Sequence, residues 1–346
     1  MVPFPSPHPF VEMSMRIDVH THYIPQAFWQ SIAASGAWYG ATVSQANGRE
    51  FVTSGPRRAG PVTAEWRFTA EERIKQMDEL GIDMHVVSTG PMFFNYHLPV
   101  PEAQGTCRII NEEIAALVRF APARFVGLAA LPAQDGVAAA EELHYAMTAL
   151  GLKGAELNCN VMGKNWDDPT LLPIFETAER LGAFLFFHPN DPPGGDRLAK
   201  YYLGNLVGFP VDTTIAVASV IMGGVLDRFS KLKLCFAHGG GYACWAAGRW
   251  DHGYTVRPEP KVNIQRLPST YLRGLFYDTL VHNHDTLRFL ADIVTPDNIF
   301  LASDWPFDMG PANPAEWFLA GAGFSPAEQA KILGDNAQRV LEIPAR

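Results

Sequence analysis

Eight short apolar runs recur along the chain, and helix-like segments separate them. The runs cover residues 16–20, 82–88, 125–131, 154–159, 184–188, 232–238, 275–280 and 299–304. Some of them, such as FLFF at 184–187, are apolar at every position, which is typical of parallel strands buried on both faces. The alternation of strand and helix therefore predicts an α/β fold, a TIM-type (β/α)8 barrel.

Two helix starts can be predicted from local signals. Thr69 and Glu72 have the spacing of a capping box, and they open an amphipathic stretch that ends at Gly81. Asp212 or Thr213 is predicted to cap the apolar helix that precedes Leu226.

Two irregular stretches interrupt the barrel pattern. The first, at about 36–66, follows the first unit and predicts a small insert or a loop over the barrel mouth. The second, 190–209, follows the fifth strand. Residues 1–15 are rich in proline and do not have the pattern of a signal peptide. We expect a flexible leader at 1–15 and a single barrel domain at 16–346.

Composition and charge limit the classes of protein to which the chain can belong. The 346 residues are 47% hydrophobic and carry a formal net charge of -9, which favours a globular enzyme and argues against nucleic-acid or anionic-membrane partners. We expect no apolar run to approach the roughly 18 residues of a membrane span. The four cysteines are scattered without a CxxC pair, so we expect a reducing, cytoplasmic location.

Polar residues stand where four of the apolar runs end. His20 ends the first run and His22 follows it, while the fifth, sixth and eighth runs end in His188, His238 and Asp304. Barrel enzymes carry their chemistry at the carboxyl ends of the strands, so these side chains are expected to converge. Imidazoles with a carboxylate are typical of a catalytic transition-metal site, usually zinc, with manganese or iron possible.

The remaining histidines are weaker candidates. Structural or solvent-facing positions are predicted for His8, His85 and His144. Loops or helix starts near the expected barrel mouth hold His97, His252, His282 and His284. Lys153 precedes the fourth strand instead of ending it, which makes it a poor bridging ligand for two metals. A mononuclear centre is therefore expected.

Several motifs occur together in one order. They are HTH at 20–22, HPND at 188–191, CFAHGGG at 235–241 followed by GRWDHG, and ASDWPF at 302–307. In this combination the chain resembles the amidohydrolase superfamily, and within it the amidohydrolase-2 branch of enzymes like aminocarboxymuconate semialdehyde decarboxylase.

The resemblance implies roles for individual residues. Zinc is expected on His20, His22, His188 and Asp304, and His238 is expected to act on metal-bound water or to shuttle a proton. Arg249, or less strongly Arg257, matches an arginine that binds the substrate carboxylate from a neighbouring subunit, which implies a homodimer or higher oligomer. A further arginine of the family corresponds to Arg57 or Arg58.

The resemblance favours a carboxy-lyase that decarboxylates an aromatic or unsaturated carboxylic acid without oxidation, as in aromatic compound catabolism. His238 or Asp304 would help to deliver a proton to the carbon that bears the carboxylate. Phe187, Trp305 and Phe307 either cover a flat substrate or pack in the core. The alternatives are a hydrolase or hydratase that uses metal-bound water and, less favoured, a noncatalytic metal-binding scaffold.

Overall fold

The computed structural model describes residues 15–55, 57–321 and 323–344. Within them, every predicted apolar run contains a strand, and the third run contains two. These barrel strands are β1 (Ile17–Tyr23), β6 (Met84–Thr89), β7 (Phe125–Gly127), β8 (Ala129–Ala130), β9 (Gly154–Asn158), β10 (Phe184–His188), β11 (Lys233–Phe236), β12 (Phe276–Asp278) and β13 (Ile299–Phe300). All of their pairings are parallel.

Hydrogen bonds beyond the regular ladders complete the ring of strands. The amide of Val19 in β1 donates to Leu301 O just after β13 at 2.9 Å, and the amide of Asp304 donates to His20 O at 2.9 Å. Between β6 and the break in the third strand, the amide of Leu128 donates to Val87 O at 2.8 Å. The predicted barrel is thereby confirmed.

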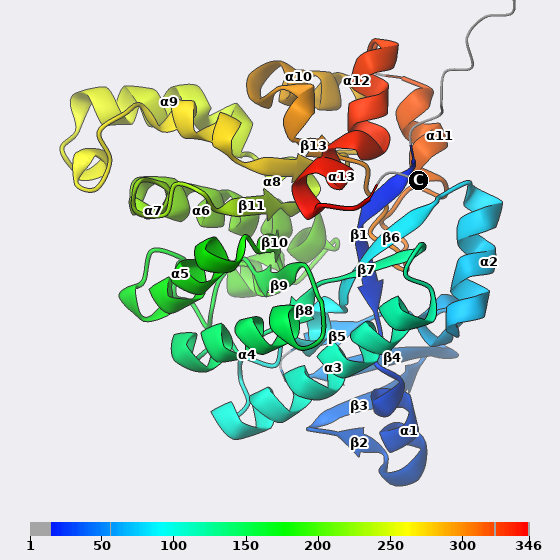
Figure 1. The fold of residues 1–346 in the computed structure, drawn as a ribbon. Coiled ribbons are helices and arrows are strands. Elements are labelled where there is room, and N and C mark those ends of the chain that lie inside the picture. Colours follow the sequence, from blue (N-terminus) through cyan, green and yellow to red (C-terminus); the bar gives the residue numbers. More distant parts are fainter. Residues whose placement is uncertain (1–14, 56, 322, 345–346) are drawn as a thin grey trace, which may run out of the picture.

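Helices cover the outside of the strands (Figure 1). The longer ones are α2 (Ala70–Leu80), α3 (Val100–Phe120), α4 (Gly136–Thr148), α5 (Leu172–Leu181), α6 (Phe209–Met222), α9 (Ala243–Val256) and α10 (His284–Val294). The others are α1 (Gln26–Ser35), α7 (Val225–Arg228), α8 (Ala237–Gly240), α11 (Pro314–Leu319), α12 (Pro326–Ala330) and α13 (Asn336–Leu341).

One of the two predicted helix caps is present. Thr69 and Glu72 form the full capping box of α2, and Gly81 ends that helix in the left-handed conformation. The predicted cap of α6 was wrong. A π-helical turn, η5 (Gly204–Gly208), runs directly into α6 at Phe209, so Asp212 and Thr213 lie inside the helix and are buried there.

The predicted first insert contains a small antiparallel sheet, which lies with α1 at one end of the molecule (Figure 1). Its strands are β2 (Ala37–Trp38), β3 (Ala41–Ala46), β4 (Arg49–Ser54) and β5 (Arg57–Ala59). Asn47 and Gly48 both have positive φ and connect β3 to β4, as an Asn-Gly hairpin turn requires. The Asn-Gly pair is a sequence signal for a β-hairpin, and the prediction of an irregular insert overlooked it.

Alternate strand residues divide the core into two layers. In β10, Phe184 and Phe186 pack in a cluster that fills the barrel interior, while Leu185 and Phe187 pack between the strands and the helices. His188 continues the inward series at the end of the strand. The apolar packing below it therefore sets the direction of its imidazole.

One helical stretch among the described residues, Gly204–Met222, is long and apolar enough to cross a membrane by length and composition. The expectation that no stretch would reach this length was wrong. Ala216, Val217 and Val220 on this stretch are fully buried in the layer between strands and helices. The barrel thus provides the apolar surroundings that its inner face requires.

The predicted leader lies outside the described residues except for Met15, which is buried and contacts Gln338 of α13. His8 also lies outside them. All four cysteines are buried and free, as expected of thiols that pack as small apolar side chains.

Candidate metal centre and active site

A local irregularity in β1 turns its two histidines into the barrel. Ile17 and Val19 belong to the inner cluster, so strict alternation would send Thr21 inward instead of His20 and His22. The pairing with β6 shifts register between Asp18 and Thr21, which changes the alternation at this point. The Asp18 carboxylate accepts hydrogen bonds from the amides of His20 and Ser303 at 3.1 Å each and so holds the bulge against the end of β13.

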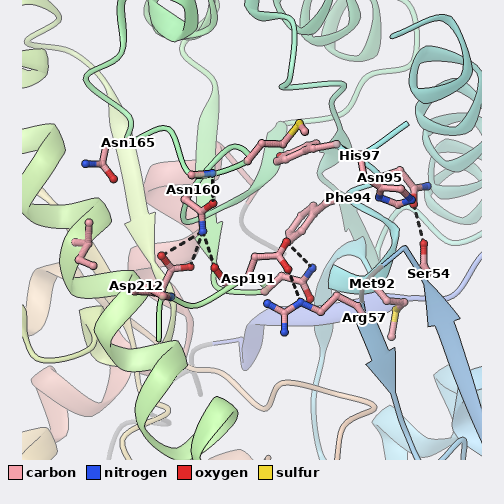
Figure 2. A pocket seen from close by; sticks show the side chains of 16 residues that line it. Ser54, Arg57, Met92, Phe94, Asn95, His97, Asn160, Asn165, Asp191 and Asp212 are labelled. Carbon is pink, nitrogen blue, oxygen red and sulfur yellow. Dashed lines mark hydrogen bonds and ion pairs between the residues drawn. The ribbon is translucent and has the colours of Figure 1, made fainter. Parts of the chain in front are cut away.

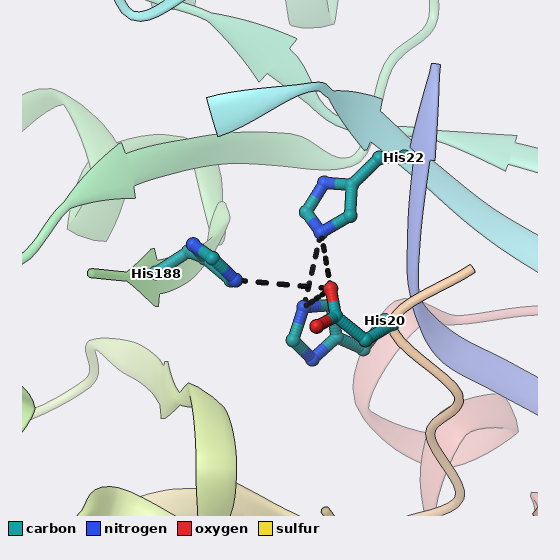
Figure 3. A group of neighbouring side chains, drawn as sticks. His20, His22 and His188 are labelled. Atoms are coloured by element: carbon teal, nitrogen blue, oxygen red, sulfur yellow. Dashed lines mark hydrogen bonds and ion pairs between the residues drawn. The ribbon is translucent and has the colours of Figure 1, made fainter. Parts of the chain in front are cut away.

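The four predicted metal ligands meet at the carboxyl ends of β1, β10 and β13. Their ligand atoms all lie within 4.8 Å of one another, and all four residues are buried. His22 Nε2 lies 3.0 Å from Asp304 Oδ1 and 3.1 Å from His20 Nε2. Figure 3 shows His20, His22 and His188 pointing toward one shared centre.

Hydrogen bonds assign the lone pairs of two of these rings. His22 Nδ1 lies 2.9 Å from Thr89 O, a carbonyl that can only accept, so Nδ1 carries the proton and Nε2 bears a lone pair. His20 Nδ1 lies 2.9 Å from Asp278 Oδ2, so Nδ1 carries a proton in this ring too and Nε2 faces the centre. Two imidazole Nε2 atoms and a carboxylate oxygen therefore face one another, an arrangement that a cation stabilises, either a metal ion or, without one, a proton on His20.

The ring of His188 and the pKa of His20 also indicate that a cation fits at this centre. Neither ring nitrogen of His188 has a hydrogen-bond partner among the described residues, although both are buried. Burial alone would lower the pKa of His20, but the charge of Asp304 and the hydrogen bond with Asp278 raise this pKa to about 10. The site thus favours positive charge, and its three nitrogens and one oxygen fit a divalent transition metal.

Asp278 at the end of β12 contacts the ligand His20 at the ring nitrogen that faces away from the centre. One carboxylate oxygen accepts from His20 Nδ1, and the other accepts from the amides of Gly239 at 2.9 Å and Leu280 at 3.1 Å. Burial alone would raise the pKa of Asp278, but the hydrogen bond with His20 and the charges of His20 and His238 keep this pKa below its ordinary value. Asp278 therefore fixes the tautomer of a ligand and the backbone after His238.

We expect Asp278→Asn to weaken metal binding by about 10–100-fold, the usual effect of removing a carboxylate behind a histidine ligand. An asparagine amide can donate to His20 Nδ1 and so place the proton on Nε2, where the metal would bind. Titration of the metal-free protein against a fluorescent chelator measures this. Unfolding by urea is the control for overall stability, and an unchanged metal affinity would contradict the role of Asp278.

His238 lies beside the four ligands without belonging to them. Its Nε2 is 3.9 Å from Asp304 Oδ2, and its ring centroid is 5.1 Å from that of His188. The backbone of His238 has φ of +56°, a conformation that costs free energy for a residue other than glycine and that clusters at functional sites. Its Nδ1 is buried and has no hydrogen-bond partner among the described residues. The residue lines a recess beside the centre, which brings its ring within reach of a molecule bound there.

A cavity of about 330 Å³ opens over the centre. His188 and Asp304 form part of its wall, together with Trp66 and Phe307. Arg57 and Arg58 of the insert line the same cavity. A neighbouring recess of about 230 Å³ contains His238 and shares Asp304 with it. The predicted loop over the barrel mouth thus contributes directly to the site.

The predicted aromatic residues have different positions. Phe307 lines the cavity, and its ring centroid is 5.1 Å from that of His22. Phe187 is fully buried against Trp166 and therefore packs in the core. Trp305 stacks on the Arg73 guanidinium at 4.1 Å, outside the residues that line this cavity. Only one of the three is placed to cover a substrate.

The predicted substrate-binding arginines lie away from the cavity of their own chain. Arg249 is exposed on α9, and Arg257 at the end of that helix is exposed and paired with Glu259 at 2.6 Å. Neither lines the cavity or the recess beside it. Their expected contact with substrate therefore stays a prediction that requires a second subunit.

Three of the remaining histidines can be placed by their contacts. His282 lines the recess with His238, whereas His284 stacks on Trp317 and bonds to its carbonyl, which makes it structural. His85 is buried in β6 and accepts from Arg73, in agreement with the predicted structural position. Arg73 itself was missed. Its guanidinium also donates to His22 O and Thr21 Oγ1, and it is almost fully buried.

The family model for amidohydrolases matches residues 17–343, which include every barrel strand and the whole centre. The chain belongs to the amidohydrolase family. Within this family, the chain is 34% identical over 334 residues to a 2-amino-3-carboxymuconate-6-semialdehyde decarboxylase of Dictyostelium discoideum. The match covers 95% of this chain and 92% of that relative. The chain is 28% identical over 292 residues to a gamma-resorcylate decarboxylase of a Polaromonas species, covering 79% of this chain and 87% of the relative.

Solved structures agree with this assignment. The chain superposes on 5-carboxyvanillate decarboxylase of Sphingomonas paucimobilis with a TM-score of 0.80 and 25% identity, over 95% of this chain and 99% of the other. A dihydroxybenzoic acid decarboxylase of Polaromonas, solved with bound manganese and the inhibitor 2-nitroresorcinol, shares the fold with a TM-score of 0.79 and 23% identity, over 96% of this chain and 98% of the other.

Proposed function

We propose that this protein is a metal-dependent carboxy-lyase, which removes carbon dioxide from an aromatic or unsaturated carboxylic acid without oxidation. The observation that carries the proposal is the position of His238. Its ring borders the four-residue centre in the recess next to the cavity, and its Nδ1 has no hydrogen-bond partner in the part of the chain that the structure describes. The relatives named above are decarboxylases of such acids, which supports this choice among the reactions of the family.

The cavity has groups suited to a flat anion. Phe307 and Trp66, whose ring centroids lie 5.3 Å apart, offer an apolar wall. Arg57 and Arg58 offer positive charge, but Arg58 is exposed and its guanidinium lies over the Phe51 ring at 4.0 Å. Arg57 is half-buried and is the better carboxylate partner, since its planar donors match a carboxylate.

The proposed reaction moves one proton and breaks one carbon–carbon bond. Arg57 binds the acid and orients it over the centre. A bound divalent ion supplies a Lewis acid that stabilises negative charge on a substrate oxygen. His238 delivers a proton to the carbon that bears the carboxylate, and the electron pair of the breaking bond restores conjugation as carbon dioxide leaves. His238 then regains its proton from solvent.

We further propose zinc as the native metal, because three imidazoles and one carboxylate with room for a further ligand are typical of catalytic zinc. Manganese and iron accept the same donors. Elemental analysis of protein purified without added metal, followed by chelation and stepwise reconstitution, separates the three. Zinc at one ion per chain with full activity supports the proposal, and activity restored by manganese or iron alone rejects it.

The proposed reaction is tested with the reconstituted enzyme and three groups of acids: hydroxybenzoates, catechol carboxylates and muconate semialdehydes. Release of carbon dioxide from one group, lost on chelation and regained with metal, supports a decarboxylase. Incorporation of labelled solvent oxygen without carbon dioxide would identify a hydrolase or hydratase instead. Stoichiometric metal binding with no turnover of any acid or ester would leave the noncatalytic metal-binding scaffold as the remaining hypothesis.

We also propose that Arg249 serves the cavity of a neighbouring subunit in a homodimer. Arg249 shares α9 with Trp245, which is 82% exposed, so this surface carries apolar area that a second copy would cover. Arg249→Ala and His238→Asn should each be inactive alone. In a mixed dimer one cavity would combine an intact His238 with an intact Arg249, so equal mixing should restore about a quarter of wild-type activity.

The control for this experiment is each variant refolded and mixed with itself. A mixture that forms hybrid dimers by native mass spectrometry, yet stays as inactive as its parents, would contradict the crossing of Arg249 between subunits.

A further inference from the structure

Arg57 is held by one residue in particular. Its Nε donates to Asp191 Oδ1 in an ion pair, which Figure 2 shows together with Asn160. The Nη1 and Nη2 groups of Arg57 make no hydrogen bond to the residues that the structure describes. Asp191 therefore uses the edge of the guanidinium and leaves the end of the fork, with four N–H donors, for another anion.

Asp191 is itself anchored from the barrel. Asn160 Nδ2 donates to the Asp191 carbonyl at 2.9 Å. The amides of Asn158 and Asn190 approach its second carboxylate oxygen at 3.4 and 3.5 Å. Asn158 lies at the end of β9, and its side-chain oxygen accepts from the backbone N–H of Asn190 at 2.9 Å. The barrel thus fixes Asp191, and Asp191 fixes an arginine of the insert.

The pair stands on the wall between two cavities. Arg57 and Asn190 line both the 330 Å³ cavity over the centre and a second cavity of about 520 Å³. Asp191 lines only the second one. The carboxylate therefore approaches Arg57 from the side away from the centre, so it does not occupy the space where a substrate would lie.

The sequence joins this pair to the metal centre. Asp191 follows the ligand His188 by three residues in the HPND motif, on the loop after β10. The same short loop thus provides one metal ligand and the partner of Arg57. A fixed loop of this kind sets the distance between the centre and the group that binds the anion.

We propose that Asp191 is a positioning residue, which orients Arg57 so that the end of its guanidinium receives the anionic group of the substrate. The inference rests on the proposed function, in which Arg57 binds the acid. Asp191 touches no reacting atom and acts through Arg57 alone. Its removal should weaken binding of the acid much more than it slows the chemical step.

A double-mutant cycle tests this directly, with Asp191→Ala, Arg57→Met and both together. Asp191→Ala should raise KM for the acid about tenfold and change kcat less than about threefold, because the fork is still present but no longer held. In the Arg57→Met background the same change should alter KM by less than about twofold. Asp191→Glu should recover part of the affinity, since it restores the carboxylate.

The pair is partly exposed, with 30% of the Arg57 side chain and 43% of the Asp191 side chain accessible, so the variants should fold. Asp196→Ala, an exposed change on the same loop, is the matched control and should leave KM unchanged. Binding of a nitro analogue of the acid, measured by calorimetry, gives the same comparison without turnover.

Three results would overturn the role of Asp191. KM could fall in Asp191→Ala, which would mean that the carboxylate only repels the acid. KM could stay unchanged. The increase could also be equal with and without Arg57, which would assign it to the loop in general. Each requires a wild-type enzyme that releases carbon dioxide, so a failure of the proposed function, seen as an inactive wild type, is distinguishable.

Discussion

Asp304→Ala should remove the metal and abolish turnover. The Asp304 carboxylate supplies the single oxygen of the ligand set, and its Oδ1 lies 3.0 and 3.2 Å from the Nε2 atoms of His22 and His20. Without it, two imidazole lone pairs remain opposite each other with no negative charge to attract the ion. We expect the affinity for the metal to fall by more than about 100-fold, beyond the loss typical of an outer residue.

Backbone conformation has to be separated from metal binding in this experiment. Asp304 has φ of +62°, where alanine is strained and asparagine is tolerated better. Asp304→Asn is therefore the second variant, and it should also lose metal while keeping the thermal stability of the metal-free wild type. Asp308→Ala, an exposed aspartate that lines the same cavity, is the control. One metal ion per chain in Asp304→Asn would contradict the assignment of Asp304 as a ligand.

His238→Asn should lower kcat by about 10²–10⁴-fold, the usual contribution of a general acid or base. Metal content should stay near that of the wild type, because His238 lies outside the four ligands. An asparagine fits the positive φ of this position but cannot exchange a proton at neutral pH. Stopped-assay turnover and elemental analysis on the same sample measure both quantities.

His282→Asn is the matched control for His238, because His282 lines the same recess and also has positive φ. It should keep most of the activity. If His238→Asn retained wild-type kcat, the proton would have to come from another group. If it lost the metal, His238 would belong to the ligand set.

The strands could be predicted because a barrel leaves its strands almost no exposed position. A residue such as His188 then stands out, since it ends a run that is otherwise apolar and buried. The same reasoning placed His20, His22 and Asp304 at one end of the barrel. Asp278 could have been found in this way too, because it is a carboxylate inside an apolar run and such a group needs a partner.

Other features depend on contacts that no local pattern encodes. The register shift in β1 is set by Asp18 together with the end of β13, which lies far along the chain. The start of α6 was mispredicted because η5 extends the helical path upstream of the expected cap. The partner of Arg57 comes from a loop 134 residues away. Sequence spacing alone indicates none of these.

The most direct test of the proposed decarboxylase follows the carbon and the proton together. The zinc-reconstituted enzyme is given a carboxyl-labelled acid in heavy water, and the gas and the product are analysed by mass spectrometry. We predict one labelled carbon dioxide per turnover and one deuterium in the product, at the carbon that had carried the carboxylate. A product that retains the label and gains solvent oxygen would contradict the account.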